Sequence, residues 1–323
     1  MTGHILSVEN LSIQFRADDG VVNAVNDVSF NLAQGEVLGF LGESGSGKSV
    51  TLRALLGLLP AHTSSIQGQM HFHGAALHAM PERQFRSIRG TRIAMVFQEA
   101  MSAFDPLFSI GDQIAETIVC HDGVSWRDAR RRAKEMLDMV QIPSPARRMS
   151  AYPHEMSGGM LQRAMIALAL ACRPELLLAD EPTTALDVSV QIQIVLLLRE
   201  LQRDLGMSVI FVTHDVGVAT EISDRLAVMY AGRFVEFGPT ATVIDAPSHP
   251  YSRGLLASNV ANAQHGERLN AIPGAPPDLT ASHSGCEFAA RCPLNIASCK
   301  EAPPPLTTIG SGHEVRCIRA AST

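Results

Sequence analysis

The chain has 323 residues, of which 46% are hydrophobic and 18% are charged, as is usual for a globular protein of one large domain or one domain with an extension. Its net charge of −6 provides no overall positive field for nucleic acid or an anionic membrane surface. The N-terminal residues do not have the pattern of a secretory signal, and no apolar run approaches the roughly 18 residues of a membrane span. We therefore expect a soluble chain that reaches a membrane only through a partner.

Alternating apolar and polar residues near the N-terminus predict two half-buried strands. The apolar positions are Leu11, Ile13 and Phe15 in the first strand and Val28, Phe30 and Leu32 in the second. The continuous apolar run at residues 37–41 indicates a strand buried on both faces. A helical pattern follows at residues 49–59 and ends before Pro60.

Farther along the chain, short apolar runs alternate with helical patterns. The runs lie at residues 93–97, 176–179, 209–212 and 226–230, and the helical patterns at residues 126–140, 161–172 and 188–205. This alternation predicts an α/β fold with a mostly parallel sheet covered by helices. Beyond about residue 238 prolines accumulate and the long periodic segments stop, so we place a domain boundary near residue 240.

The segment between the strand at 37–41 and the next helix matches the phosphate-loop pattern G-x-x-x-x-G-K-[ST]. Its residues are Gly42, Glu43, Ser44, Gly45, Ser46, Gly47, Lys48 and Ser49. Glycines allow consecutive backbone N–H groups to face phosphate oxygens, and the helix start adds a favourable dipole. Lys48 would reach the β- and γ-phosphates of ATP, and the Ser49 hydroxyl would ligate Mg²⁺.

Two acids, Asp180 and Glu181, end the apolar run at residues 176–179. Asp180 would hold the Mg²⁺, and Glu181 would polarise the attacking water. Taken alone, an apolar run followed by two acids is also what a strand meeting a solvated loop looks like. The phosphate loop in the same chain favours the catalytic interpretation.

Together these motifs resemble those of the ABC ATPases. Residues 156–160, Met-Ser-Gly-Gly-Met, resemble that family's signature loop, and the resemblance implies that Ser157, Gly158 and Gly159 meet the γ-phosphate held by a second subunit. It also implies a Q-loop contact to Mg²⁺ and water at Gln98, a D-loop ending at Asp187 (residues 185–187), and a switch histidine at His214. Phe15 is the candidate for stacking on adenine, although packing in the core is an alternative.

The fold implied by this resemblance is a P-loop NTPase (RecA-like) core with an antiparallel β subdomain and an inserted helical subdomain. The ATPase domain would span residues 1–240, with the helical subdomain at about 99–160. An irregular C-terminal extension would occupy residues 241–323.

A narrower resemblance is to the ATPases of oligopeptide/dipeptide importers, a branch that also includes nickel uptake systems. It rests on residues 152–155 (Tyr-Pro-His-Glu), 249–251 (His-Pro-Tyr) and 272–274 (Ile-Pro-Gly). It implies ATP-driven import of peptides, with this chain at the cytoplasmic face of the inner membrane. Its partners would be two permease subunits, a separate substrate-binding protein and a second ATPase subunit. A heterodimer is suggested, and a homodimer stays open. Residues 102–106 depart from the branch pattern, which leaves the identity of the membrane partner open.

Four of the six cysteines, Cys286, Cys292, Cys299 and Cys317, lie near the C-terminus. Four thiolates can hold a [4Fe–4S] cluster or a tetrahedral zinc ion. The branch resemblance implies the cluster, with zinc or four free thiols as alternatives and His283 or His313 as substitute ligands. Three rival functions are an ATPase acting on nucleic acid or the ribosome, half of an exporter, and a nucleotide switch without transport. The chain has neither two ATPase halves nor long heptad repeats, so we expect no nucleic acid partner.

Overall fold

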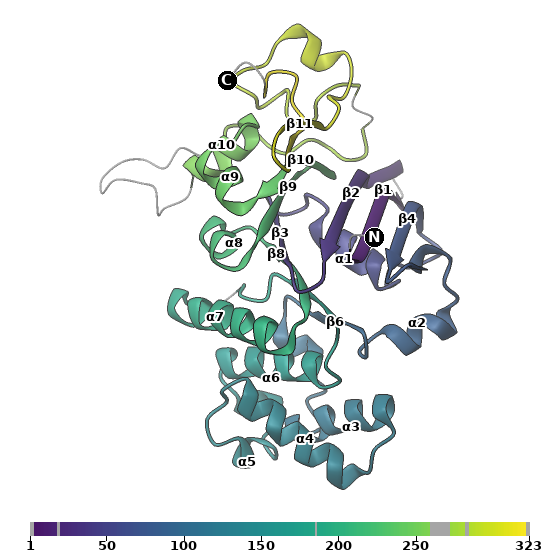
Figure 1. Cartoon of the computed structure of the whole chain (residues 1–323), viewed down its shortest axis with the longest axis vertical. Coiled ribbons are helices and arrows are strands. Elements are labelled where there is room, and N and C mark those ends of the chain that lie inside the picture. Colours follow the sequence, from purple (N-terminus) through teal and green to yellow (C-terminus); the bar gives the residue numbers. More distant parts are fainter. Residues whose placement is uncertain (1–2, 18–19, 185, 259–271, 282–283, 321–323) are drawn as a thin grey trace. The chain divides into compact units, whose positions relative to one another are not determined.

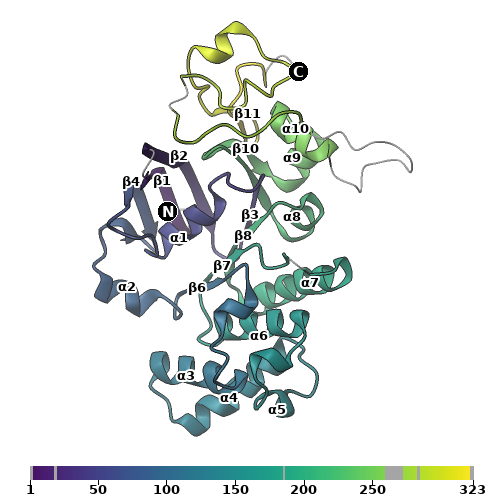
Figure 2. The same ribbon diagram turned by 180° about the vertical axis from the view of Figure 1, so that it is seen from behind.

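The structure is a computed structural model, which describes residues 3–17, 20–184, 186–258, 272–281 and 284–320 and is shown from two sides in Figures 1 and 2. The chain divides into two compact units. Unit 1 comprises Met1–Ala33, Val37–Ala79 and Phe211–Thr323, and unit 2 comprises Gln34–Glu36 and Met80–Ile210. Unit 1 thus contains residues from both sides of residue 240, where the sequence predicts a boundary.

An antiparallel sheet in unit 1 is built from residues near the N-terminus (Figure 1). Its strands, in the order β2-β1-β4-β5, are β1 (His4–Ala17), β2 (Gly20–Ala33), β4 (Ser64–Phe72) and β5 (Ala75–Ala76). Leu11 and Ile13 of β1 are fully buried, while Gln14 is exposed. The predicted alternation, and with it the antiparallel β subdomain, is confirmed.

The remaining strands of unit 1 combine parallel and antiparallel pairs. They are β3 (Val37–Leu41), β9 (Arg225–Tyr230), β10 (Arg233–Pro239), β11 (Thr307–Gly310) and β12 (His313–Val315), and β8 (Ser208–Thr213) has residues in both units. β3 pairs with β9 in parallel, and β9, β10, β12 and β11 follow in antiparallel order. The strands β10 to β12 were not predicted. The C-terminal residues, expected to be irregular, therefore add a hairpin to the same sheet as β3.

Four α-helices and two short 3₁₀ turns complete the described part of unit 1. They are α1 (Lys48–Leu55), α8 (Val216–Ile222), α9 (Thr240–Asp245), α10 (Pro250–Ala257), η1 (Leu77–Ala79) and η5 (Ala297–Lys300). α1 ends at Leu55 instead of residue 59, because Gly57 takes a φ of 59° and the Leu58 N–H donates to the Arg53 carbonyl oxygen at 2.9 Å. This left-handed turn is a common way to end a helix.

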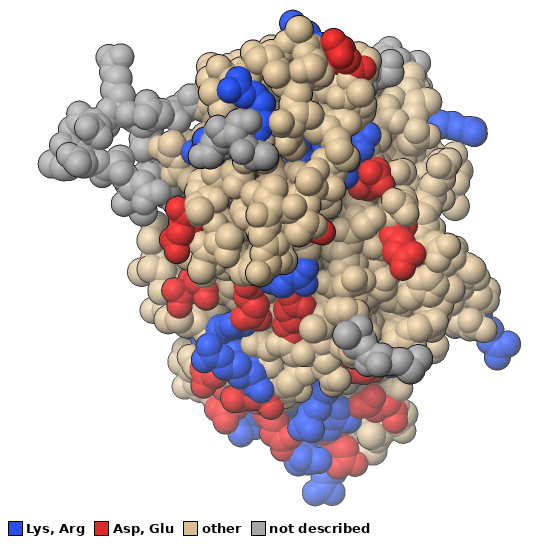
Figure 3. All heavy atoms as spheres, turned by 45° about the horizontal axis from the view of Figure 1, so that its top comes forward, with Lys and Arg blue, Asp and Glu red and all other residues tan. Residues whose placement is uncertain are grey.

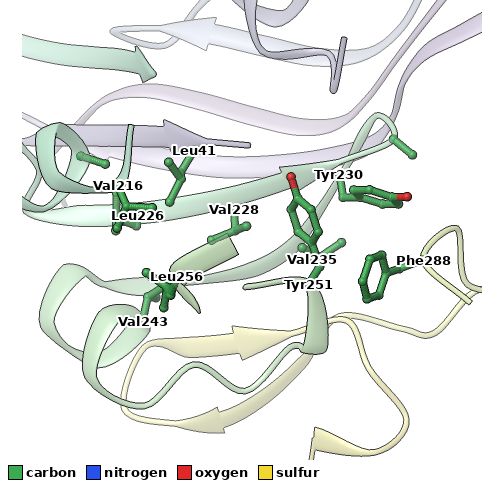
Figure 4. Close-up of a cluster of buried hydrophobic side chains, with 12 residues drawn as sticks. Leu41, Val216, Leu226, Val228, Tyr230, Val235, Val243, Tyr251, Leu256 and Phe288 are labelled. Carbon is green, nitrogen blue, oxygen red and sulfur yellow. The ribbon is translucent and has the colours of Figure 1, made fainter. Parts of the chain in front are cut away.

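Aromatic side chains from separate segments form a buried cluster in unit 1 (Figure 4). The ring centroid of Tyr251 in α10 lies 4.6 Å from that of Tyr230 in β9 and 5.5 Å from that of Phe288. Tyr230 and Phe288 meet edge to face at 5.2 Å. Such pairs stabilise a core beyond the area that they bury. Phe288 therefore anchors the C-terminal residues to the strand that pairs with β3.

Unit 2 contains two parallel strands and most of the helices. The strands are β6 (Ile93–Val96) and β7 (Leu176–Asp180), and the helical elements are α2 (Glu82–Ile88), η2 (Ala100–Ala103), α3 (Ile110–Asp122), α4 (Trp126–Met139), α5 (Pro145–Arg148), η3 (Pro153–Glu155), α6 (Gly158–Leu170) and α7 (Val188–Leu205). The elements from η2 to α6 lie between β6 and β7 in the chain, and α4 packs against α3 and α6. This is the predicted helical insertion.

Charged side chains on the α4 surface are paired within unit 2. Arg130 pairs with Asp112, and Arg131 bonds Glu135 at 2.7 Å. Figure 3 shows acidic and basic side chains intermingled on the face that it draws. The arginines of α4 are therefore part of a mixed surface and do not form a separate basic patch. Within the described ranges, no helix has both the length and the hydrophobicity to cross a bilayer.

Candidate nucleotide-binding site

The phosphate-loop residues, 42–49, connect the end of β3 to the start of α1 in unit 1. All five residues of β3 are buried, so the loop begins at a fixed point. Gly47 has a φ of 105°, and a Cβ there would lie 2.4 Å from the Ala24 carbonyl oxygen. A Cβ on Gly42 would lie 2.2 Å from the Met229 carbonyl oxygen. Both positions therefore require glycine for steric reasons, in addition to the need for N–H groups that face a ligand.

The ammonium group of Lys48 lies within this loop, and the residue as a whole is 3% exposed. Its Nζ donates to the carbonyl oxygens of Gly42 at 2.8 Å and Glu43 at 2.7 Å, and to Ser46 Oγ at 3.2 Å. Oxygen atoms already surround the charge, and phosphate oxygens can replace them. The buried cation and the curled backbone fit a triphosphate, and Ser49 follows Lys48 in the first turn of α1.

In unit 2, the two acids lie at the carboxyl end of β7. Asp180 is the last residue of the strand and is 2% exposed. Glu181 follows with a φ of 47°, a conformation that non-glycine residues rarely adopt. Such a residue persists only where its surroundings hold it, and these positions cluster at functional sites.

The structure brings Gln98 and Glu181 together, as their predicted shared role requires. Gln98 Nε2 donates to Glu181 Oε2 at 3.4 Å, because β6 and β7 are parallel neighbours and both residues follow the same edge. The Thr184 hydroxyl donates to the same carboxylate oxygen at 2.9 Å. Thr184 was missed in the sequence, and its signal was its position three residues after Glu181, which is close enough for a hydrogen bond between the two side chains.

The signature turn lies at the start of α6. Ser157 caps the helix, since its Oγ accepts from the Met160 N–H at 3.4 Å, and Gly158 is the first helical residue. Ser157 and Gly158 are exposed. A Cβ on Gly159 would lie 2.8 Å from Val190 Cγ1 of α7, so this glycine also permits close packing of the two helices.

The other predicted residues lie at the start of α7, between β8 and α8, and within β1. Asp187 is exposed and caps α7, and a hydrogen bond from the Ser189 hydroxyl lowers the pKa of its carboxyl. Ala185, in the same predicted loop, lies outside the described residues. His214, in unit 1, is exposed between β8 and α8. Phe15 is half-buried in β1, opposite Val22 in β2 and Ser64 in β4.

The four C-terminal cysteines surround one small cavity in unit 1, with a volume of about 20 Å³. All four are free thiols, and burial raises the pKa of Cys286 to about 12. Among the described residues, however, no three or more His, Cys, Asp or Glu side chains are arranged to hold a metal ion. His313 instead binds Glu236 at 2.8 Å, and His283 lies outside the described residues. As they stand, the cysteines converge but do not form a metal site.

The fold matches solved structures of ATP-binding cassettes. The dimeric post-hydrolysis state of the cassette MJ0796, bound to ADP and phosphate, is 28% identical, with a TM-score of 0.65 over 73% of this chain and 98% of that one. Residues 25–184 match the family description "ABC transporter". The fold and the phosphate loop thus define an ABC-type ATPase, an enzyme that uses ATP and Mg²⁺.

The C-terminal residues give a finer assignment. Residues 235–299 match the description "Oligopeptide/dipeptide transporter, C-terminal region". The dipeptide transport ATP-binding protein DppD of Bacillus subtilis is 44% identical over 97% of this chain and 94% of its own length. The oligopeptide transport ATP-binding protein OppD of Salmonella typhimurium is 47% identical over 98% and 93%. The chain belongs to the ATP-binding proteins of the ABC transporter family, in the branch with this C-terminal region.

Proposed function

We propose that this chain is the ATP-hydrolysing subunit of an importer that moves peptides across the cytoplasmic membrane. One observation carries the proposal: the similarity to dipeptide and oligopeptide transport ATP-binding proteins extends over 97–98% of the chain. It includes the C-terminal region as well as the ATPase motifs.

In this function the loop at residues 42–49 binds the triphosphate. Lys48 exchanges its loop oxygens for those of the β- and γ-phosphates, and Phe15 stacks on the adenine. Ser49, Asp180 and Gln98 would hold the Mg²⁺, and the ion would supply positive charge beside the phosphate oxygens. The position of Lys48 at the start of α1, directly after the glycine-rich loop, and of Asp180 at the carboxyl end of the buried strand β7 supports these roles.

Glu181 acts on the attacking water, assisted by Gln98 and by His214 at the γ-phosphate. Hydrogen bonds from Thr184 and Gln98 to Glu181 Oε2 support the role, since they fix the carboxylate that must orient the water.

A second ATPase subunit completes the site. Ser157, Gly158 and Gly159 would contact the γ-phosphate bound by the partner subunit. Asp187 would lie at the interface between the two subunits. The exposure of Ser157 and Gly158 at the start of a 13-residue helix supports this role, because the N–H groups there are suited to an anion. The partner is a sister ATPase in a heterodimer or a second copy of this chain.

Two membrane permease subunits would receive the movement that ATP binding and hydrolysis cause in the pair of ATPase subunits. This chain would lie on the cytoplasmic face of the membrane, and a separate protein would supply the peptide. The segment after Gln98 supports a docking role, since Met101, Leu107 and Phe108 are 54%, 78% and 57% exposed. Large apolar side chains grouped on a surface favour a protein contact. Nucleic acid is not among the proposed partners.

The four cysteines are proposed to ligate a [4Fe–4S] cluster after a small rearrangement around their shared cavity. Their convergence supports this, and the cluster has no part in the hydrolysis steps above. Iron and sulfide measured in anaerobically purified protein test it. Four iron and four sulfide per chain support the cluster, whereas one zinc per chain or metal-free thiols contradict it.

Peptide uptake tests the transport function. Cells that lack this chain should take up a labelled peptide slowly, the chain should restore uptake, and the Lys48→Ala variant should not. Restored uptake by Lys48→Ala would contradict the proposed ATP site. Normal uptake in its absence, or purification without any membrane protein, would instead favour a nucleotide switch or another cargo.

A further inference from the structure

An ion pair connects the C-terminal residues to the phosphate loop within unit 1. The guanidinium of Arg291 donates to both carboxylate oxygens of Glu43, from Nη1 to Oε2 at 2.8 Å and from Nη2 to Oε1 at 3.0 Å. The Arg291 side chain is 5% exposed and that of Glu43 29%. Two parallel hydrogen bonds fix direction as well as distance, which a single lysine contact would not do.

The backbone of Glu43 is held from the same side. Its N–H donates to Tyr251 Oη at 2.9 Å, and Tyr251 is fully buried beside Tyr230 and Phe288 (Figure 4). On the other side, the Glu43 carbonyl oxygen accepts from Lys48 Nζ at 2.7 Å. Glu43 is therefore bonded to the C-terminal residues through its side chain and N–H, and to the phosphate-binding lysine through its carbonyl.

The C-terminal residues also fix Arg291 itself. Its Nε donates to the Pro273 carbonyl oxygen at 3.0 Å and its Nη2 to that of Ile272 at 3.3 Å, and its guanidinium carbon lies 5.7 Å from the centre of the Tyr230 ring. Beside this contact, Pro276, Pro277 and Leu279 line a cavity of about 210 Å³ together with residues 43–46 of the loop. The loop is thus supported by residues that follow it by more than 200 positions.

A buried ion pair often serves stability or fold specificity alone. The position of this pair gives it a different consequence, because Glu43 is a phosphate-loop residue and its backbone bonds to Lys48. If only a fraction of the molecules hold the loop in its binding conformation, the observed affinity for the ligand falls in proportion to that fraction. Restraint of Glu43 therefore acts on nucleotide affinity as well as on stability.

We propose that Arg291 is a positioning residue of the ATP site, which holds the phosphate loop in its binding conformation through Glu43. The C-terminal region is then a structural part of the ATP site, separate from any role in docking or metal binding. The inference rests on the proposed role of residues 42–49 in phosphate binding. Arg291 itself does not touch the nucleotide.

Steady-state ATPase measurements on the full chain test the proposal through the separate values of KM and kcat. In the Arg291→Met variant we expect KM for ATP to rise about fivefold to tenfold, because fewer molecules hold the loop in its binding conformation. We expect kcat to change less than about twofold, because saturating ATP restores that conformation. Arg291→Lys should recover part of the affinity. Glu43→Gln, which keeps the volume of the side chain, should raise KM similarly.

A double-mutant cycle and a control separate positioning from loosening of the fold. The variant with both Arg291→Met and Glu43→Gln should have the KM of the single variants, since both remove one interaction. Arg233→Met removes a comparable ion pair, to Glu287 at 2.7 Å, whose side chains are 18% and 10% exposed. It should lower the melting temperature but leave KM unchanged.

Additive effects of the two substitutions, or equal KM values in the Arg291→Met and Arg233→Met variants, would overturn the proposal. If Arg291→Met does not fold, Glu43→Gln with an unchanged KM has the same consequence. The Lys48→Ala variant distinguishes failure of the proposed role of Arg291 from failure of the proposed phosphate-binding role of residues 42–49. Unaltered ATP binding in Lys48→Ala would remove the phosphate-loop role, on which the inference rests.

Discussion

The side-chain amide of Gln98 donates to the carboxylate of Glu181 at 3.4 Å, although 83 positions separate the two residues. The contact arises because each residue follows one of two parallel neighbouring strands, β6 and β7. Glu181 adopts a φ of 47°, and Thr184 bonds the same oxygen. A strained backbone and two donors thus restrain one carboxylate, as expected for a group that must orient a water molecule.

Glu181→Gln should lower ATP turnover by a factor on the order of 10² or more, because the amide cannot accept a proton from the attacking water. ATP binding should be retained, since the substitution preserves shape. The matched control is Glu175→Gln, just before the same strand, which alters a half-exposed ion pair with Arg92. Turnover in Glu181→Gln as fast as in that control would remove Glu181 from catalysis.

Ser157→Ala should reduce ATP turnover at saturating ATP and weaken ATP-dependent subunit association. The hydroxyl is proposed to reach a partner's phosphate, and its loss also removes a helix cap worth about 1 kcal/mol. Ser125→Ala provides the control, because Ser125 caps α4 by accepting from the N–H three residues later at 3.2 Å, as Ser157 does in α6, and it also donates to Asp128 at 2.6 Å. The two variants should have similar melting temperatures but different turnover, and equal turnover would mean that Ser157 is only a cap.

Glu236→Leu should destabilise the chain by about 3 kcal/mol or more. The Glu236 side chain is fully buried, and its oxygens accept from the N–H groups of Ser248 and His249 and bond His313 Nε2. Loss of the carboxylate leaves these groups unpaired. Denaturant unfolding measures the effect. A change below about 1 kcal/mol would show that water satisfies these groups in the variant.

Stability should fall as the pH drops from 7 to 5, because burial lowers the pKa of His249 from 6.5 to about 3. The unfolded chain then binds a proton that the folded chain does not, so stability is full above pH 6.5 and is lost on acidification. At pH 5 the loss is about 2 kcal/mol. The variant His249→Asn keeps a capping side chain and should show a weaker pH dependence between 7 and 5. An identical dependence in the variant would exclude His249 as its origin.

The sequence by itself determined the elements and motifs that depend on neighbouring residues. The 3.6-residue periodicity predicted α7 with its observed bounds, Val188–Leu205, and in the structure Gly206 caps the helix. The phosphate-loop pattern located residues 42–49 because its glycines and lysine act through local backbone geometry. The strand at residues 37–41 was equally clear, since a strand buried on both faces is a continuous apolar run.

Only the tertiary structure decided the features that depend on distant partners. Glu236 interrupts the apolar pattern of β10, and its burial is explained by its contacts with the N–H groups of Ser248 and His249 and with His313, 77 positions away. The pairing of Glu43 with Arg291, 248 positions away, leaves no local signal at either residue. Periodicity and propensity act over one or two turns of chain, whereas a buried ion pair is selected by whichever segments the folded core brings into contact. For this reason the phosphate-loop pattern could be recognised in the sequence, but the contact of its Glu43 with Arg291 could not.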